Sequence, residues 1–251
     1  MLKIENTEVF GWDATIRGMR NPKNSWEKSD SKFVRDPDYG CFGACPCAEL
    51  VDCDCCHVGP NDLKLMTTLR NAGTDHRKFM RMIIVYLDIT APLYWWKEFD
   101  TYKVGTVANS CSTMHKIADK EFTLEDFSHE HLCDDELALL EEVIARLNMN
   151  RIVFIAKNDK QVDRYAVMSD ECYAKYKKTL WWQMIQLLPS SYNQKRTVML
   201  NYEVLANMYK SRRHHKLDEW HTLCDWIESL PYSKLISSGF ARDVLEGYVP
   251  T

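Results

Sequence analysis

Apolar residues recur along this chain with two different periods, which predicts a protein of mixed strands and helices. Alternating apolar positions predict a buried strand at residues 82–89. Residues 196–200 have strand character, and residues 3–9 favour a short strand. Spacings of three and four predict helices at residues 12–20, 63–71, 134–148, 171–188, 201–212 and 217–230. Residues 150–156 favour another strand, and the polar stretch 21–39 is typical of a long loop.

The stretch from residue 91 to 115 has the most unusual composition. An Ala-Pro break after the predicted strand leads into a short helix that carries Trp95 and Trp96, and a loop with several hydroxyl groups follows at residues 104–112. An aromatic helix that ends in a polar loop suits the binding of a flat ring and a phosphate. A core helix with two packed tryptophans explains the same residues equally well.

Six of the ten cysteines lie within sixteen residues, from Cys41 to Cys56. Metal binding through thiolates and an adjacent imidazole is one interpretation, with zinc or an iron–sulfur cluster as the bound group. The candidate ligands are Cys45, Cys47, Cys53, Cys55, Cys56 and His57. Reactive or redox-labile surface thiols are the alternative, since the spacing matches no standard zinc finger or ferredoxin. A metal here would stabilise the loop rather than form a catalytic centre.

Length, composition and charge narrow the class of protein. With 251 residues the chain can form one large domain or two small ones, and 45% hydrophobic and 27% charged residues are ordinary for a soluble globular protein. The net charge of -4 argues against a partner that is a nucleic-acid polymer. No run of eighteen apolar residues predicts a membrane span, and the amino terminus does not resemble a secretory signal. We therefore expect a cytoplasmic protein with no membrane contact.

Two separated segments resemble the flavin-dependent thymidylate synthase family. Ala91-Pro92 matches the opening of a family element, and the residues 109–112, Asn-Ser-Cys-Ser, match the family's Asn-Glu-x-Ser after one inserted residue. In the second segment several residues keep the family's spacing over twenty-five positions. They are Leu188, Pro189, Asn201, Leu205, Asn207 and Arg212. The second segment is the more specific match, because its register is kept without any insertion.

The resemblance implies a mixed α/β fold (α+β), similar to thymidylate synthase complementing protein, with a central sheet and long helices. One domain would span residues 1–251, with the cysteine-rich segment at about 40–58 as an insertion. The implied reaction converts dUMP to dTMP, with methylenetetrahydrofolate as carbon donor, FAD as hydride carrier and NADPH as reductant. Members of the family are commonly homotetramers, so the resemblance also implies a homo-oligomer.

Site residues follow from the resemblance position by position. Arg212 would be catalytic and would face the uracil ring, although an arginine at a helix end also has the ordinary role of interacting with backbone carbonyls. The expected cofactor-binding residues are Tyr102, Lys103, Asn201 and Asn207. The expected substrate-binding residues are Glu98, Ser110, Ser112 and Arg212.

The chain departs from the family where the chemistry is most specific. Thr101-Tyr102-Lys103 replaces the family's Arg-His-Arg signature, and Met114, Ile185 and Glu203 stand at positions where the family has arginine. Lys103 keeps a positive charge but not the bidentate fork of arginine. Two alternatives to the enzyme therefore stay open. One is a nucleotide-binding or regulatory protein that kept the fold and lost catalysis, and the other is a metal-binding protein centred on the cysteine-rich segment.

Overall fold

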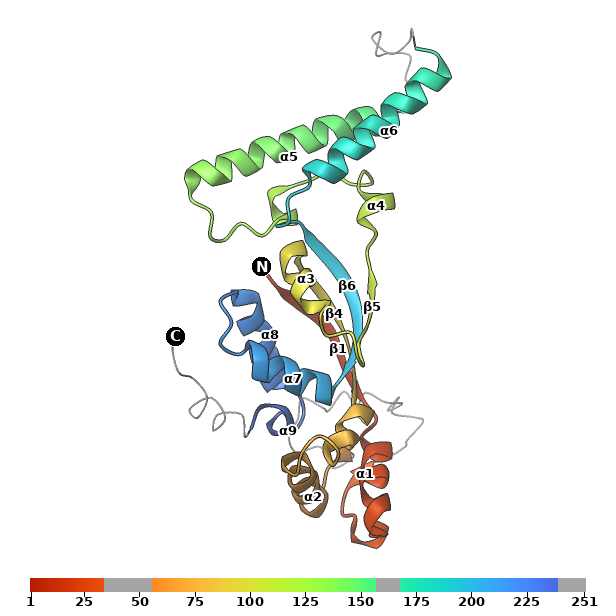
Figure 1. Cartoon of the computed structure of the whole chain (residues 1–251), viewed down its shortest axis with the longest axis vertical. Coiled ribbons are helices and arrows are strands. Elements are labelled where there is room, and N and C mark those ends of the chain that lie inside the picture. Colours follow the sequence, from red (N-terminus) through yellow and green to blue (C-terminus); the bar gives the residue numbers. More distant parts are fainter. Residues whose placement is uncertain (34–55, 157–167, 239–251) are drawn as a thin grey trace. The chain divides into compact units, whose positions relative to one another are not determined.

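The structure is a computed structural model that describes residues 1–33, 56–156 and 168–238. A four-stranded sheet has the strand order β1-β4-β6-β5 (Figure 1). Its strands are β1 (Lys3–Phe10), β4 (Ile84–Pro92), β5 (Val107–Ser110) and β6 (Asn193–Asn201). A separate antiparallel pair joins β2 (Lys32–Phe33) to β3 (Cys56–His57). The predicted central sheet with long helices is confirmed.

The strands predicted at residues 82–89 and 196–200 have one buried side. Along β4, Val85, Leu87 and Ile89 are almost fully buried while Tyr86 is exposed, as expected for a period of two. Along β6, Val198 and Leu200 are fully buried. Strand β5 lies at the edge of the sheet, and all four of its residues are exposed, which explains why no alternation predicted it.

The described residues form two compact units, which we call the hairpin unit and the main unit. The hairpin unit contains Thr90–Phe99 and Ser110–Arg196, together with Met1. The main unit contains Leu2–Ile89, Asp100–Asn109 and the chain from Thr197 onward. The prediction of a single domain over the whole chain stays a prediction.

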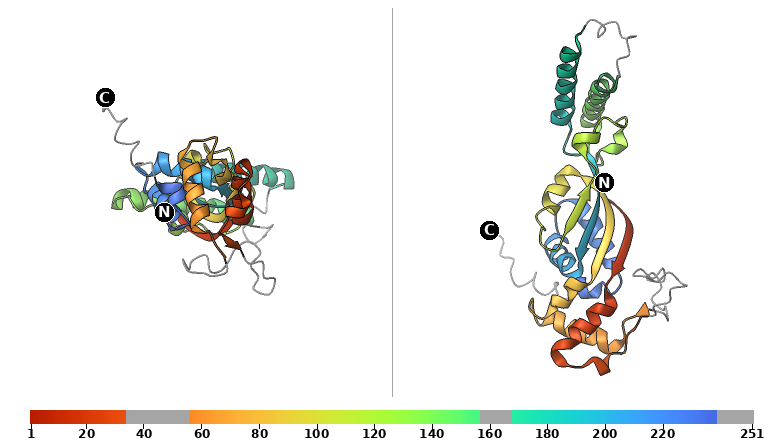
Figure 2. Two further views of the ribbon diagram at one scale, coloured as in Figure 1. Left: turned by 90° about the horizontal axis from the view of Figure 1, so that it is seen from below. Right: turned by 90° about the vertical axis from the view of Figure 1, so that its right-hand side faces the viewer.

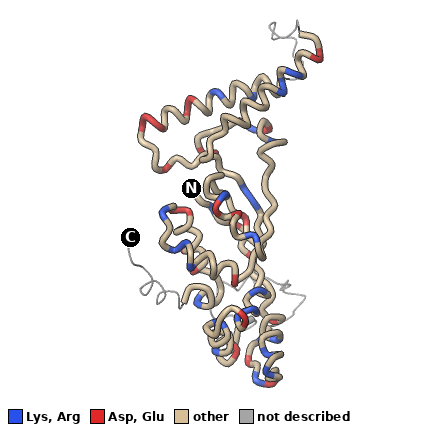
Figure 3. The backbone as a smooth tube through the Cα atoms, viewed as in Figure 1, with Lys and Arg blue, Asp and Glu red and all other residues tan. Residues whose placement is uncertain are grey.

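Two long helices dominate the hairpin unit, as Figure 2 shows. They are α5 (Asp134–Ile155) and α6 (Asp170–Leu187), and shorter elements accompany them: α3 (Leu93–Phe99), α4 (Thr113–Lys116) and η6 (Leu124–Asp126). Leu140, Ile144 and Leu147 of α5 pack in one core with Met184 of α6 and Phe127. In Figure 3 acidic residues gather at the start of α5, where they favour the helix because they oppose its dipole.

The predicted strand at residues 150–156 is wrong, because α5 continues through it to Ile155. The buried stripe of α5 continues past Leu147 at helical spacing to Arg151, whose Nε donates a hydrogen bond to the Ala118 carbonyl at 3.0 Å. No glycine or proline interrupts the segment. Tertiary contacts of a long helix therefore outweigh the local strand preference of its apolar end.

Helices account for most of the rest of the main unit. They are α1 (Trp12–Arg20), the short 3₁₀ helices η1 (Asn21–Lys23), η2 (Trp26–Lys28) and η5 (Arg77–Met82), α2 (Pro60–Asn71), α7 (Tyr202–Arg212), α8 (Asp218–Ser229) and α9 (Lys234–Ser237). Helix α7 contacts η5, α8 and α9, so it is central to the core of this unit. Its Leu205 and Met208 are fully buried, as are Trp220 and Ile227 of α8.

The predicted helix boundaries in this unit agree with the structure to within three residues. None of the described helices combines the length and the apolar content that a bilayer span requires.

Candidate active site

Arg212, at the end of α7, contacts Tyr102 of the segment 100–109 in the main unit, which ends in the first residues of β5 and which we call loop 100–109. Its Nε donates a hydrogen bond to the Tyr102 hydroxyl oxygen at 3.0 Å, across a separation of 110 residues in the sequence. Its guanidinium carbon lies 4.7 Å from the ring centroid of the fully buried Trp220 and 5.7 Å from that of Tyr102. Two aromatic rings and one hydrogen bond thus restrict the orientation of this cation.

The other end of the same loop lies against the start of α7. Asn201 caps the helix, because its side-chain oxygen accepts hydrogen bonds from the backbone N–H groups of Glu203 and Val204, both at 3.1 Å. Gly105 has a φ of +78°, and a Cβ atom there would lie 2.8 Å from the Asn201 side-chain nitrogen. Only glycine fits this approach without strain. The loop therefore follows α7, with Gly105 near its first turn and Tyr102 near its last.

Glu203, which stands where the family has an arginine, is buried between two arginines of η5. Arg77 Nε donates to Glu203 Oε1 at 3.3 Å, and Arg81 also bonds this carboxylate. Arg77 Nη2 donates to the side-chain oxygen of the exposed Asn207 at 3.3 Å. The carboxylate of Glu203 thus replaces a cation on α7, while Arg77 and Arg81 bring positive charge from a different element.

The expected substrate-binding residues Glu98, Ser110 and Ser112 belong to the hairpin unit. Ser110 and Ser112 are exposed, and the Ser112 hydroxyl accepts a hydrogen bond from the His115 backbone N–H at 3.0 Å as the cap of α4. Glu98 is half-buried on α3. Lys103, which is exposed, lies on the loop of the main unit.

Trp95 and Trp96 are core residues rather than a surface for a ring. Their exposed fractions are 0% and 1%, and their ring centroids lie 5.0 Å apart in an edge-to-face arrangement. Of the two interpretations open at the sequence level, the packed core helix is the one the structure supports.

Arg196 is a candidate residue that the sequence pattern did not reveal. Its guanidinium carbon lies 4.1 Å from the ring centroid of Trp96, and its Nε donates to the side-chain oxygen of Gln194 at 3.0 Å. Gln194 in turn donates to the Cys111 carbonyl at 2.8 Å. The guanidinium is thus one side chain away from the segment between Ser110 and Ser112. The only signal in the sequence is a basic pair, Lys195-Arg196, at the start of the strand predicted at residues 196–200.

The metal hypothesis concerns residues that lie mostly outside the described part of the chain. Cys45, Cys47, Cys53 and Cys55 are not described, and of Cys56 only the backbone in β3 is; His57 follows in β3 and is half-buried. Within residues 1–33, 56–156 and 168–238, no group of three or more His, Cys, Asp or Glu side chains is arranged to hold a metal. A zinc or iron–sulfur site in the cysteine-rich segment therefore stays a prediction.

Comparison with known proteins gives matches among solved structures. No family model and no curated protein sequence matches this chain. Thymidylate synthase X (ThyX) from Helicobacter pylori, in a structure with FAD and dUMP, is similar over 98% of this chain and 100% of its own, with 14% sequence identity and a TM-score of 0.58. A second structure of the flavin-dependent enzyme from the same organism, also with FAD and dUMP, gives a TM-score of 0.57 at 14% identity over 94% of this chain and 98% of its own.

A methylase of a second type shows the same likeness. The UMP/dUMP methylase PolB from Streptomyces cacaoi, bound to 5-Br dUMP, covers 96% of this chain and 95% of its own, with 10% identity and a TM-score of 0.50. The similarity thus extends over nearly the whole chain. This chain has the fold of the flavin-dependent thymidylate synthases.

Proposed function

We propose that this protein is a flavin-dependent methylase that converts dUMP to dTMP, with methylenetetrahydrofolate as the carbon donor and NADPH as the reductant. The observation that carries the proposal is the contact of Arg212 with Tyr102. It joins the two segments that resemble the family, in a fold shared over nearly the full chain with proteins whose structures hold FAD and dUMP.

Loop 100–109 and α7 have side chains that fit a flavin nucleotide. Lys103 and Asn207 are both exposed. The ammonium group of Lys103 can therefore contact a phosphate of the flavin nucleotide, and the amide of Asn207 can hydrogen-bond the edge of the flavin ring. Since Gly105 has no side chain, the loop backbone next to Asn201 is not covered. Tyr102, Lys103, Asn201 and Asn207 would therefore hold FAD, which when bound supplies the hydride.

Arg212 is the group that we assign to the uracil ring. Its planar guanidinium can hydrogen-bond a ring oxygen and stabilise the negative charge that develops when the ring is activated. Since Tyr102 and Trp220 already restrict its orientation, little conformational freedom is lost when the ring binds.

Recognition of the nucleotide is assigned to Ser110 and Ser112, together with Glu98 and with Arg196 as the nearby cation. Arginine suits this task, because its fork matches the geometry of phosphate oxygens. Arg196 would partly compensate for the arginines that Met114 and Ile185 replace.

The proposal is tested by the absorbance of the purified protein and by flavin reoxidation that depends on dUMP and folate. We expect a flavin absorbance band at roughly 450 nm, a property of the cofactor itself. Arg212→Ala should lower the reoxidation rate by about a hundredfold or more, as expected for the loss of a charged group that acts on the transition state. Arg213→Ala is the matched control, because the neighbouring, half-buried Arg213 pairs instead with the exposed Asp225 at 2.6 Å. Equal rates in both variants would exclude the assigned role of Arg212.

A nucleotide-binding or regulatory protein that lost catalysis is the second candidate, and the buried Glu203 favours it. A carboxylate between Arg77 and Arg81 reverses the charge at a position where the family has a cation. A colourless protein that binds dUMP but does not reoxidise added reduced flavin in its presence would support this candidate over the enzyme.

A further inference from the structure

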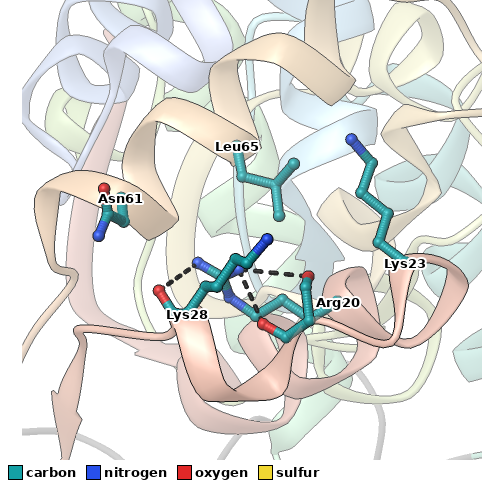
Figure 4. A pocket seen from close by; sticks show the side chains of 6 residues that line it. Arg20, Lys23, Lys28, Asn61 and Leu65 are labelled. Atoms are coloured by element: carbon teal, nitrogen blue, oxygen red, sulfur yellow. Dashed lines mark hydrogen bonds between the residues drawn. The ribbon is translucent and has the colours of Figure 1, made fainter.

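The main unit contains a second candidate site, away from loop 100–109 and α7 in the sequence. The chain that follows α1, through η1 and η2, faces α2 across a cavity of about 570 Å³ (Figure 4). This volume lies in the range of roughly 300–1,000 Å³ that is typical of small-molecule sites. The cavity is lined by Arg20, Lys23, Ser25, Lys28, Asn61 and Leu65.

Arg20 builds the wall of this cavity. It is 4% exposed, and its Nε donates to Asp62 Oδ1 at 2.6 Å. Its other nitrogens donate to the carbonyls of Ser25 at 3.1 Å and of Lys28 at 3.0 Å. Because these hydrogen bonds hold the backbone of the turn, the Cα atoms of Lys23 and Lys28 are held in defined positions.

Two carboxylates next to the cavity, those of Asp62 and Asp30, are already engaged. Asp62 accepts hydrogen bonds from Ser29 at 2.7 Å and Ser31 at 2.6 Å, besides its ion pair with Arg20. Asp30 caps α2, because its carboxylate accepts from the backbone N–H groups of Asn61 at 2.8 Å and of Asp62 at 3.1 Å. These two carboxylates offset the charge of Arg20 and the positive end of the α2 dipole.

Lys23 and Lys28 are the two ammonium groups of the lining, and no described carboxylate lies within ion-pair distance of either. Both side chains are exposed. Figure 4 shows both side chains extending from the turn toward α2, where Leu65 faces them and Asn61 lies at the first turn of the helix. The lining thus combines two ammonium groups, one amide and one apolar side chain.

We propose that this cavity binds a phosphorylated small molecule. Lys23 and Lys28 hold the phosphate, the Asn61 amide donates a further hydrogen bond, and the carbon part of the ligand contacts Leu65. An anion is selected because each ammonium group gains a charge-assisted contact that it lacks in the free protein. The proposal does not depend on the flavin chemistry, since none of these residues belongs to loop 100–109 or α7.

Calorimetric titration of the full chain with phenyl phosphate and with inorganic phosphate tests this site at low ionic strength. We expect phenyl phosphate to bind more tightly than inorganic phosphate, and Leu65→Ala to remove that difference. The double variant Lys23→Gln/Lys28→Gln should weaken both probes at least about tenfold for each lysine removed.

Lys64→Gln is the matched control, because Lys64 is an exposed lysine of α2 that does not line the cavity. It should leave both affinities unchanged. The proposal is overturned if the double variant binds phenyl phosphate as the unmodified chain does, or if the unmodified chain shows no saturable binding up to about 10 mM.

Discussion

The hydroxyl group of Tyr102 fixes one edge of the Arg212 guanidinium, and the ring of Trp220 fixes one face. A tyrosine here accepts a hydrogen bond that phenylalanine cannot accept, while both fill the same space. The phenol in place of the family's histidine thus has a definite physical role. It orients the cation that we assign to the uracil ring.

Tyr102→Phe should therefore reduce the rate of dUMP-dependent flavin reoxidation by about tenfold or more, the effect of one hydrogen bond to a charged group. Since the ring and its packing remain, the melting temperature should change little. Tyr209→Phe is the control, because Tyr209 of α7 bonds Glu228 at 2.5 Å instead. A Tyr102→Phe enzyme with the full rate would show that the orientation of Arg212 does not depend on this bond.

Asp62 couples the stability of the main unit to pH. Burial alone would raise the pKa of Asp62, but hydrogen bonds from Ser31, Ser29 and Arg20 outweigh burial and hold the pKa below its ordinary value of 3.8. A carboxyl group with a lowered pKa stabilises the folded state above that ordinary value. This contribution is lost as the pH falls through the lower, folded-state pKa.

Asp62→Asn should lower the free energy of unfolding near pH 7 by about 3–5 kcal/mol, because Arg20 is left buried without its counter-ion. The loss of stability below about pH 4 should also become shallower in this variant. Urea unfolding as a function of pH measures both effects. Asp13→Asn serves as control, since the pair of Asp13 with Arg17 is exposed and worth little.

At the level of elements, loop 100–109 and α7 form one structural pair. Gly105 and Gly73 both have positive φ, +78° and +110°, but a Cβ would meet Asn201 only at Gly105, with nothing within 4 Å at Gly73. Alanine at Gly73 therefore tests the free-energy cost of the left-handed backbone alone. Alanine at Gly105 adds the cost of the close contact with Asn201.

Gly73→Ala should cost about 1 kcal/mol of stability, the price of a left-handed conformation alone. Gly105→Ala should cost more, and it should also weaken flavin binding because the loop must move away from Asn201. Thermal unfolding and flavin titration of the two variants provide the comparison. Equal losses of stability and unchanged flavin affinity would mean that the position of the loop does not matter to the cofactor.

The sequence predicts a structural feature well when the contacts that determine the feature are between residues close together in the chain. The strand at Ile84–Pro92 and the helix at Tyr202–Arg212 follow from period and capping, because Asn201 is a standard helix cap and α7 supplies a buried face. The pairing of Glu203 with Arg77 spans 126 residues, and no local pattern contains it. The family resemblance assigned Tyr102 and Arg212 to the same site. The hydrogen bond between them is seen only in the structure.

At the scale of the molecule, the fold is retained where the specific chemistry has changed. Similarity covers 98% of the chain at 14% identity, although Thr101-Tyr102-Lys103 replaces the family signature. A fold needs only the pattern of buried positions, whereas a site needs particular groups. The shared fold therefore supports the architecture more strongly than it supports the activity, and the activity has to be tested on Arg212.

Helix α5 has apolar residues on the face opposite its packed side. Leu140, Ile144 and Leu147 are buried within the hairpin unit, while Met149 and Ile152 are 58% and 60% exposed. A helix that is apolar on two faces is normally covered on both. We therefore expect a homo-oligomer in which a second copy of the chain covers the outer face of α5.

Met149→Glu should weaken this association at least about tenfold, because a charge would be buried without a partner. Ala14→Glu is the matched control, since it adds the same charge at an exposed position of α1. Sedimentation velocity over a range of protein concentrations gives the assembly state of both variants and of the unmodified chain. The unmodified chain and Ala14→Glu should sediment as the same oligomer, while Met149→Glu shifts toward the monomer. If the unmodified chain is a monomer at all concentrations, or if Met149→Glu assembles equally well, the outer face of α5 is not a contact between copies.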